Sequence, residues 1–142
     1  AANILANIKK NLEKIVSYLE ENHISDPRVK RLVKKYKPEN ISESIPNSSY
    51  TSYSVNKGEK IVFCIRSKDE KQKLVDLNTM MFVAIHELAH VMTKSIGHTT
   101  EFWNNMKYLL KKGIKIGVYK KINYRDNPVP YCGTSITDSP LQ

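Results

Sequence analysis

The segment from Met80 to Met92 constrains the fold of this chain most, because almost every residue in it is apolar. A stretch that is hydrophobic on all sides predicts a buried helix, and we place this helix at about 76–95. Its polar residues are His86, Glu87 and His90. Polar groups in a buried helix are costly unless they have partners. The fold must therefore supply partners for two imidazoles and a carboxylate.

These polar residues form the pattern His-Glu-x-x-His over residues 86–90. Side chains four residues apart lie on one face of a helix, so His86 and His90 can bind one metal ion together. Glu87 then has the position of a general base in metal-assisted hydrolysis. The competing interpretation is a core helix whose histidines bond to backbone carbonyls. The pattern favours a site for one Zn²⁺ per chain.

A catalytic zinc ion usually has three protein ligands and an open position for water. We expect His98 to be the third ligand, because Gly97 can end the helix and let the chain turn back toward the site. Glu101 is the alternative, since zinc enzymes use both ligand sets. His23 lies in a polar stretch, and we expect it to be solvated.

Residues 86–103, HELAHVMTKSIGHTTEFW, resemble the metal-binding core of the WLM and SprT-like (Spartan-like) metallopeptidases. Those families have His-Glu-x-x-His, a variable connection and then a Gly-His step, followed shortly by Phe-Trp. The resemblance implies that His86, His90 and His98 bind the metal and that Glu87 is the catalytic base.

The resemblance also implies a minimal zincin core, in which Glu101 is structural and not a ligand. The chain departs from the family pattern in its longer connection before His98 and in Thr99-Thr100, which replaces a frequent Gly-Pro. The C-terminal zinc ribbon of many SprT-like proteins is absent, because the two cysteines are Cys64 and Cys132. These departures concern the branch of the family more than the zinc site.

We interpret the chain as a zinc-dependent endopeptidase that hydrolyses peptide bonds in a protein substrate with a zinc-bound water activated by Glu87. The developing oxyanion needs a further donor, and the candidates are Tyr124 and Tyr131, of which we name Tyr131. Either can equally be a packing tyrosine. Two alternatives stay open: a non-catalytic, zinc-stabilised binding domain, and a basic nucleic-acid-binding module in which the motif is incidental.

The chain carries 23 basic and 14 acidic residues, a net charge of +9. Basic residues are concentrated in the stretches 28–37 and 107–125. Such a surface either binds nucleic acid without sequence preference or is simply solvated. The resembled families include enzymes that act on DNA-bound proteins, so nucleic-acid-associated proteins are a candidate substrate class.

Other features bear on the cellular setting. No segment is long and apolar enough to span a membrane, and we expect a monomer. Two distant cysteines favour a reducing, intracellular compartment. The chain begins at Ala1, so an N-terminal segment removed by processing is an open alternative. The Lys-, Asn- and Ile-rich composition hints at an AT-rich genome, such as that of a large DNA virus or a parasite.

We expect a single α+β domain over residues 1–142, with an N-terminal helical pair over 1–38, a zincin-like core over 49–112 and an ordered tail over 113–142. A small antiparallel sheet should pack on the active-site helix. The strand at 60–66 is the candidate edge along which an extended substrate would bind.

The remaining elements are predicted from hydrophobic periodicity and from caps. They are a helix over about 3–21, a helix from the Asp26 cap to about Lys37, a polar connection over 39–48, strands over 50–55 and 60–66 with a turn at 56–59, a helix over about 100–112 that begins after Thr99 or Thr100 and ends at Gly113, and an ordered loop over 127–133.

Overall fold

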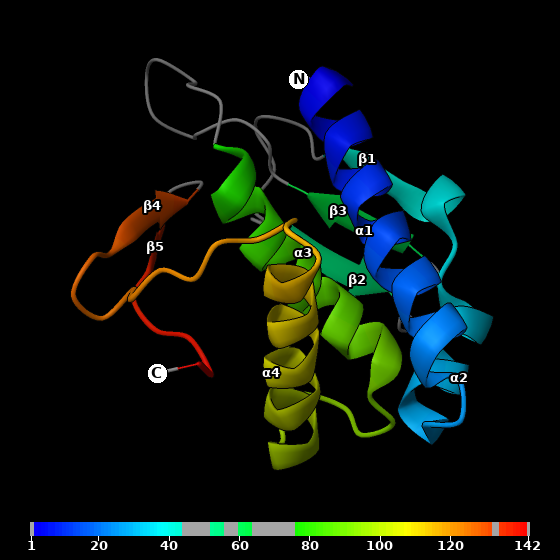
Figure 1. The fold of residues 1–142 in the computed structure, drawn as a ribbon. Helices are drawn as coiled ribbons and strands as arrows, with labels where there is room; N and C mark the ends of the chain where they lie inside the picture. Colours follow the sequence, from blue (N-terminus) through cyan, green and yellow to red (C-terminus); the bar gives the residue numbers. More distant parts are fainter. Residues whose placement is uncertain (1, 44–51, 56–59, 64–75, 132–133, 142) are drawn as a thin grey trace.

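The computed structural model describes residues 2–43, 52–55, 60–63, 76–131 and 134–141. Both cysteines and the predicted turn at 56–59 lie outside these residues. In the described part, α3 (Leu77–Met92) lies at the centre, and α1 (Ala2–His23), α2 (Pro27–Lys35) and α4 (Thr100–Lys115) pack around it (Figure 1).

The buried helix predicted from the apolar run is confirmed. From Thr79 to its end, every residue of α3 is buried except His86 and His90. Asp76 caps the start of the helix: its carboxylate accepts hydrogen bonds from the Thr79 N–H at 2.9 Å and the Thr79 hydroxyl at 2.8 Å. The C-terminal end of the helix falls at Met92, earlier than the predicted position near residue 95.

The N-terminal helical pair has the predicted form. The Asp26 side chain accepts a hydrogen bond from the Arg28 N–H at 2.9 Å, and Pro27 is the first residue of α2. This helix ends at Lys35 and not at Lys37. The cause is Pro38, which disfavours a helical conformation in the residue before it, and Lys37 is accordingly extended.

The sheet that packs near α1 and α3 is mixed and not antiparallel as predicted. Its strands β1 (Ile41–Glu43), β2 (Ser52–Val55) and β3 (Lys60–Phe63) have the order β1-β3-β2. Strand β2 runs antiparallel to β3 with Ser54 opposite Ile61, and β1 runs parallel to β3 with Ile41 opposite Ile61.

The assignment of residues 60–66 as the substrate-binding edge is therefore wrong, because β3 is the central strand. The three consecutive residues Ile61, Val62 and Phe63 are all buried, as is typical of a strand covered on both faces. Strand β1 lies in the segment that was predicted to be a polar connection. Three residues are too few to show an alternating pattern, and the partner of β1 is distant in the sequence.

Helix α4 continues past Gly113 to Lys115, so the predicted end at this glycine is wrong. A Cβ atom at Gly113 would lie 3.3 Å from Ile85 Cδ1, which shows that the glycine lets α4 approach α3 closely. The chain turns instead at Gly117, whose φ is +81°. A positive φ favours glycine because side chains with a Cβ rarely adopt it.

The described C-terminal residues include two paired strands where a loop was predicted, and residues 132 and 133 of that predicted loop lie outside the described residues. Strands β4 (Val129–Tyr131) and β5 (Thr134–Ile136) pair antiparallel and lie to the left of the helices in Figure 1. The segment before them is fixed to α3 through Asn78, which accepts a hydrogen bond from the Lys120 N–H at 2.8 Å and donates one to the Lys120 carbonyl at 3.0 Å. No helix in the described ranges combines the length and hydrophobicity that a membrane crossing needs.

Candidate metal centre

Two histidines of α3 share one face of the helix, as their spacing predicts. The His86 and His90 ring centroids lie 5.0 Å apart. Both rings are half-buried, whereas their neighbours along the helix are fully buried. From Thr79 to Met92, the two histidines are thus the residues of α3 that solvent or a bound group can reach.

The loop after α3 brings a third histidine to this pair. Thr93 is extended, and Gly97 has a φ of +85°. His98 Nε2 lies 3.2 Å from His86 Nε2. One ring nitrogen from each of His86, His90 and His98 lies within 4.8 Å of the other two. Two nitrogens bound to one tetrahedral zinc ion are about 3.3 Å apart, so this group is of a size that could hold a metal ion.

The alternative ligand Glu101 has a different place in the structure. Its carboxylate accepts hydrogen bonds from the Lys94 and Ser95 N–H groups, both at 3.1 Å, and from the Ser95 hydroxyl at 2.8 Å. The Ser95 and Thr99 hydroxyls lie 2.6 Å apart. Among the described residues, the metal-holding group consists of the three histidines and does not include Glu101. Glu101 instead fastens the loop that carries His98.

Helix α4 places one aromatic ring, that of Phe102, against all three histidine rings. Thr99 caps this helix by accepting a hydrogen bond from the Phe102 N–H at 3.2 Å. The Phe102 ring centroid lies 4.3 Å from that of His90, 4.9 Å from His98 and 5.0 Å from His86. Sequence reasoning did not predict this contact. The signal that could have revealed it is the position of Phe102 shortly after His98, on the first turn of the next helix.

Burial sets the charge state of His86. Desolvation, with a smaller contribution from the neighbouring His90 and His98, lowers the pKa of His86 to about 3. The His86 imidazole is therefore neutral at neutral pH, and the neutral ring is the form that binds metals. Glu87 lies next to His86 on α3 and is only 5% exposed, so a buried carboxylate accompanies the three imidazoles.

A buried polar network holds α3 and α4 together behind the site. The Thr93 hydroxyl donates to the Ala89 carbonyl at 2.7 Å and accepts from Asn105 Nδ2 at 2.8 Å. The Asn105 carbonyl oxygen accepts from Arg28 Nη1 at 3.3 Å, and Arg28 pairs with Asp26 at 2.8 Å. The network thus joins the end of α3, the middle of α4 and the start of α2. Sequence reasoning did not identify Thr93 or Asn105.

The two candidate tyrosines are both buried. Tyr124 is 0% exposed, packs 4.7 Å from the Phe82 ring and accepts a hydrogen bond from the Tyr119 hydroxyl at 3.2 Å. Burial raises the pKa of Tyr124, which is the behaviour of a packing tyrosine. Tyr131 ends β4 and is 4% exposed within the hydrophobic core. Its catalytic role stays a prediction.

The fourth histidine lies elsewhere. His23 is half-buried at the end of α1, with its ring centroid 5.8 Å from Tyr18 and 6.4 Å from Tyr108. The expectation that it is simply solvated is therefore wrong in part, because two tyrosine rings cover it. It remains outside the metal-holding group, which makes it a useful control residue.

Comparison with known proteins identifies viral relatives of this chain. The chain is 35% identical over 146 aligned positions to an uncharacterized protein of Acanthamoeba polyphaga mimivirus; the match covers 100% of this chain and 74% of the relative. It is 28% identical over 118 positions to an uncharacterized protein of Invertebrate iridescent virus 6, covering 82% and 64%. A protein of Invertebrate iridescent virus 3 is 41% identical over 68 positions, covering 48% and 42%.

These relatives are viral, which is consistent with a viral origin of this chain. No solved structure matches it. The family model of the WLM domain matches residues 9–128, a range that contains the three histidines, Glu87 and all four helices in whole or in large part. The chain belongs to the WLM domain family.

Proposed function

We propose that this chain is a single zincin-like domain that acts as a zinc-dependent endopeptidase. The observation that carries the proposal is the convergence of the His86, His90 and His98 ring nitrogens within 4.8 Å of one another, beside Glu87. Membership of the WLM domain family, which suggests a metallopeptidase, supports it. The viral relatives are themselves uncharacterized, so they give no information about the substrate.

The donor set fits zinc. Three imidazoles are a ligand set of catalytic zinc sites, which leave a fourth position for water or substrate. When bound, zinc would lower the pKa of water and polarise a peptide carbonyl. His86, His90 and His98 would hold the ion, and the Glu101 carboxylate would support it by fixing the loop of His98.

Glu87 would serve as the general base. Its carboxylate follows His86 directly on α3 and is 5% exposed, so it lies beside the three imidazoles and largely out of contact with bulk water. It would take a proton from the attacking water and deliver it to the amide nitrogen that leaves. Tyr131 would donate a hydrogen bond to the oxyanion if the C-terminal hairpin contributes to the reaction; replacing it with Phe should then lower kcat with little change in KM.

The deciding experiment combines metal content with cleavage. Zinc should be measured by mass spectrometry on the wild type, on His98→Ala and on His23→Ala, which removes a histidine outside the group. We expect about one zinc per chain in the wild type and His23→Ala, and loss in His98→Ala. Cleavage of an unfolded protein should stop in Glu87→Gln, which keeps its zinc. Wild-type rates in Glu87→Gln would refute the assignment of the base.

The same data distinguish a peptidase from the non-catalytic alternative. A zinc-stabilised binding domain would bind stoichiometric zinc and lose stability with a chelator, yet it would cleave no unfolded protein and would be unaffected by Glu87→Gln. A folded wild type without stoichiometric zinc, even when zinc is supplied, would refute the metal site.

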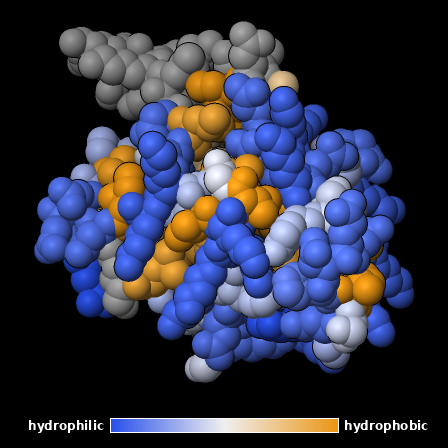
Figure 2. Space-filling model, viewed as in Figure 1, coloured by the Kyte–Doolittle hydropathy of each residue, from blue (hydrophilic) through white to orange (hydrophobic). Residues whose placement is uncertain are grey.

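A second candidate function is binding to nucleic acid, so that the substrates would be nucleic-acid-associated proteins. The fold joins the two basic stretches on one surface: Arg28 Cζ lies 4.2 Å and Lys112 Nζ 5.3 Å from the centroid of the Tyr108 ring. Hydrophilic side chains cover most of the face in Figure 2. Binding should weaken steeply with salt. Equal binding by wild type and a double variant Arg28→Gln, Lys112→Gln would argue against this surface.

A further inference from the structure

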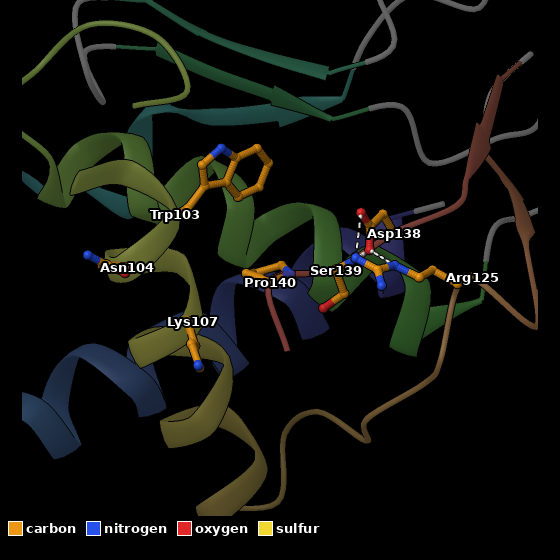
Figure 3. A pocket seen from close by; sticks show the side chains of 7 residues that line it. All are labelled: Trp103, Asn104, Lys107, Arg125, Asp138, Ser139 and Pro140. Atoms are coloured by element: carbon orange, nitrogen blue, oxygen red, sulfur yellow. Dashed lines mark hydrogen bonds and ion pairs between the residues drawn. The ribbon is translucent and has the colours of Figure 1, made fainter. Parts of the chain in front are cut away.

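A pocket of about 350 Å³ lies between α4 and the C-terminal segment. Trp103, Asn104 and Lys107 line it from α4 (Figure 3). The opposite side consists of Arg125 and the three residues 138–140, Asp, Ser and Pro. A cavity of this size can accept an amino-acid side chain together with part of its backbone.

Trp103 connects this pocket to the metal centre. Its ring forms part of the pocket wall, and its centroid also lies 5.3 Å from that of His98 and 6.4 Å from that of His86. The indole is 40% exposed. Alternate side chains of an extended peptide are about 7 Å apart. A peptide whose scissile bond lies at the histidines can therefore place a nearby side chain in the pocket, past the indole.

The charges of the pocket favour an acidic occupant. Lys107 is exposed and forms no ion pair with any described residue. Arg125 directs Nε and Nη2 to the Asp138 carboxylate, at 2.8 and 3.4 Å, which satisfies that carboxylate and leaves the guanidinium Nη1 available. The residues that line the pocket thus include two cations and one anion. Trp103 and Pro140 supply apolar surface on which the methylene groups of a side chain can lie.

We propose that this pocket is a substrate subsite that selects a glutamate side chain near the scissile bond, with Lys107 as the residue that recognises its carboxylate. The aliphatic stem would lie against Trp103, and Arg125 would add positive potential from the opposite wall. This assignment rests on the proposed peptidase function, but the affinity of the pocket can be measured without cleavage.

Trp103 is the only tryptophan of the chain, so its fluorescence reports directly on this pocket. The zinc-loaded full chain should be titrated with a blocked alanine pentapeptide that has glutamate at its centre, and with the same peptide carrying glutamine. We expect the glutamate peptide to bind about five- to tenfold more tightly, as for one or two charge-assisted contacts. The difference should shrink as salt is added.

Two variants locate the preference. Lys107→Gln should bring the affinity ratio of the two peptides close to one, whereas Lys111→Gln, one turn further along α4 and outside the pocket lining, should keep the wild-type ratio. Equal affinities in the wild type would overturn the proposal. So would a ratio that Lys107→Gln leaves unchanged, as expected if the glutamate bound the metal instead.

Cleavage of the same peptides distinguishes this proposal from the function on which it rests. A glutamate preference in binding that depends on Lys107, together with no chelator-sensitive cleavage of any peptide or unfolded protein, would refute the peptidase function and leave the pocket assignment standing. Cleavage without a glutamate preference near the scissile bond would do the reverse.

Discussion

Removal of the Glu101 carboxylate should weaken metal binding at a site to which it contributes no ligand atom. In Glu101→Ala the loop between α3 and α4 loses hydrogen bonds from the Lys94 N–H, the Ser95 N–H and the Ser95 hydroxyl. Hydrogen bonds to a charged group contribute about 1.5–3 kcal/mol each when protected, and less when exposed. Because water can replace these exposed bonds, we expect the three bonds together to stabilise the ordered loop by about 2–3 kcal/mol.

The lost free energy lowers the affinity for zinc because the loop carries His98. If the loop must be ordered for His98 to bind, 2–3 kcal/mol corresponds to about 30- to 150-fold weaker zinc affinity, near the usual 10–100-fold effect of outer residues that orient a ligand. Glu101→Gln keeps one acceptor oxygen and should lose about half of the 2–3 kcal/mol that stabilises the ordered loop. His98→Ala removes the ligand itself, so its zinc affinity should be lower than that of Glu101→Ala.

The assay is competition for zinc with a chromogenic chelator at neutral pH. Glu20→Gln, an exposed substitution on α1, is the control and should match the wild type. The free energy of unfolding of the metal-free protein should change by no more than about 1 kcal/mol, because the loop can disorder while the helices stay folded, so that most of the cost appears only when His98 must bind zinc. Zinc affinity within twofold of wild type in Glu101→Ala would refute the argument, and so would an affinity below that of His98→Ala.

Three further changes test the packing and the site. Asn105→Leu should lower the free energy of unfolding by about 1–3 kcal/mol in urea titrations, because the Thr93 hydroxyl and Arg28 lose a partner. Gly113→Val should cost about 1–3 kcal/mol by crowding Ile85, whereas Gly113→Ala should stay near wild type because helix propensity offsets a single tight contact. Zinc at 100-fold above its dissociation constant should stabilise the wild type by about 2.7 kcal/mol. A calorimeter should detect no such gain in a variant lacking the third histidine. An unchanged Asn105→Leu midpoint, or equal stability of the two Gly113 variants, would contradict these expectations.

Local signals in the sequence were sufficient to predict that the four helices exist and that three histidines converge. The apolar run of α3, the Asp26 and Thr99 caps and the spacing of His86 and His90 each depend on residues close together in the chain, and each was predicted. The approach of His98 was also predicted, because a glycine just before it can adopt a positive φ.

Features that depend on distant partners were missed or wrong. Strand β1 has three residues and becomes a strand only through its parallel pairing with β3, so its own sequence carries almost no signal. Gly113 was interpreted as a helix end, but its role comes from the closeness of Ile85, which no local pattern shows. The contacts of Phe102 with three histidines and of Asn105 with Thr93 likewise depend on how α3 and α4 cross.

The burial of α3 from Thr79 to Met92, apart from its two histidines, has a consequence for the local opening motions of the folded protein. Amide protons of an element exchange with solvent through local opening where it is exposed, and through global unfolding where it is packed from every direction. The amides of residues 80–92 should therefore exchange at the slowest rates in the chain, close to the limit set by complete unfolding. The two helical histidines would then keep a fixed relative position for the lifetime of the folded state, and the slow motions that admit or release a bound group must come from the loop that carries His98.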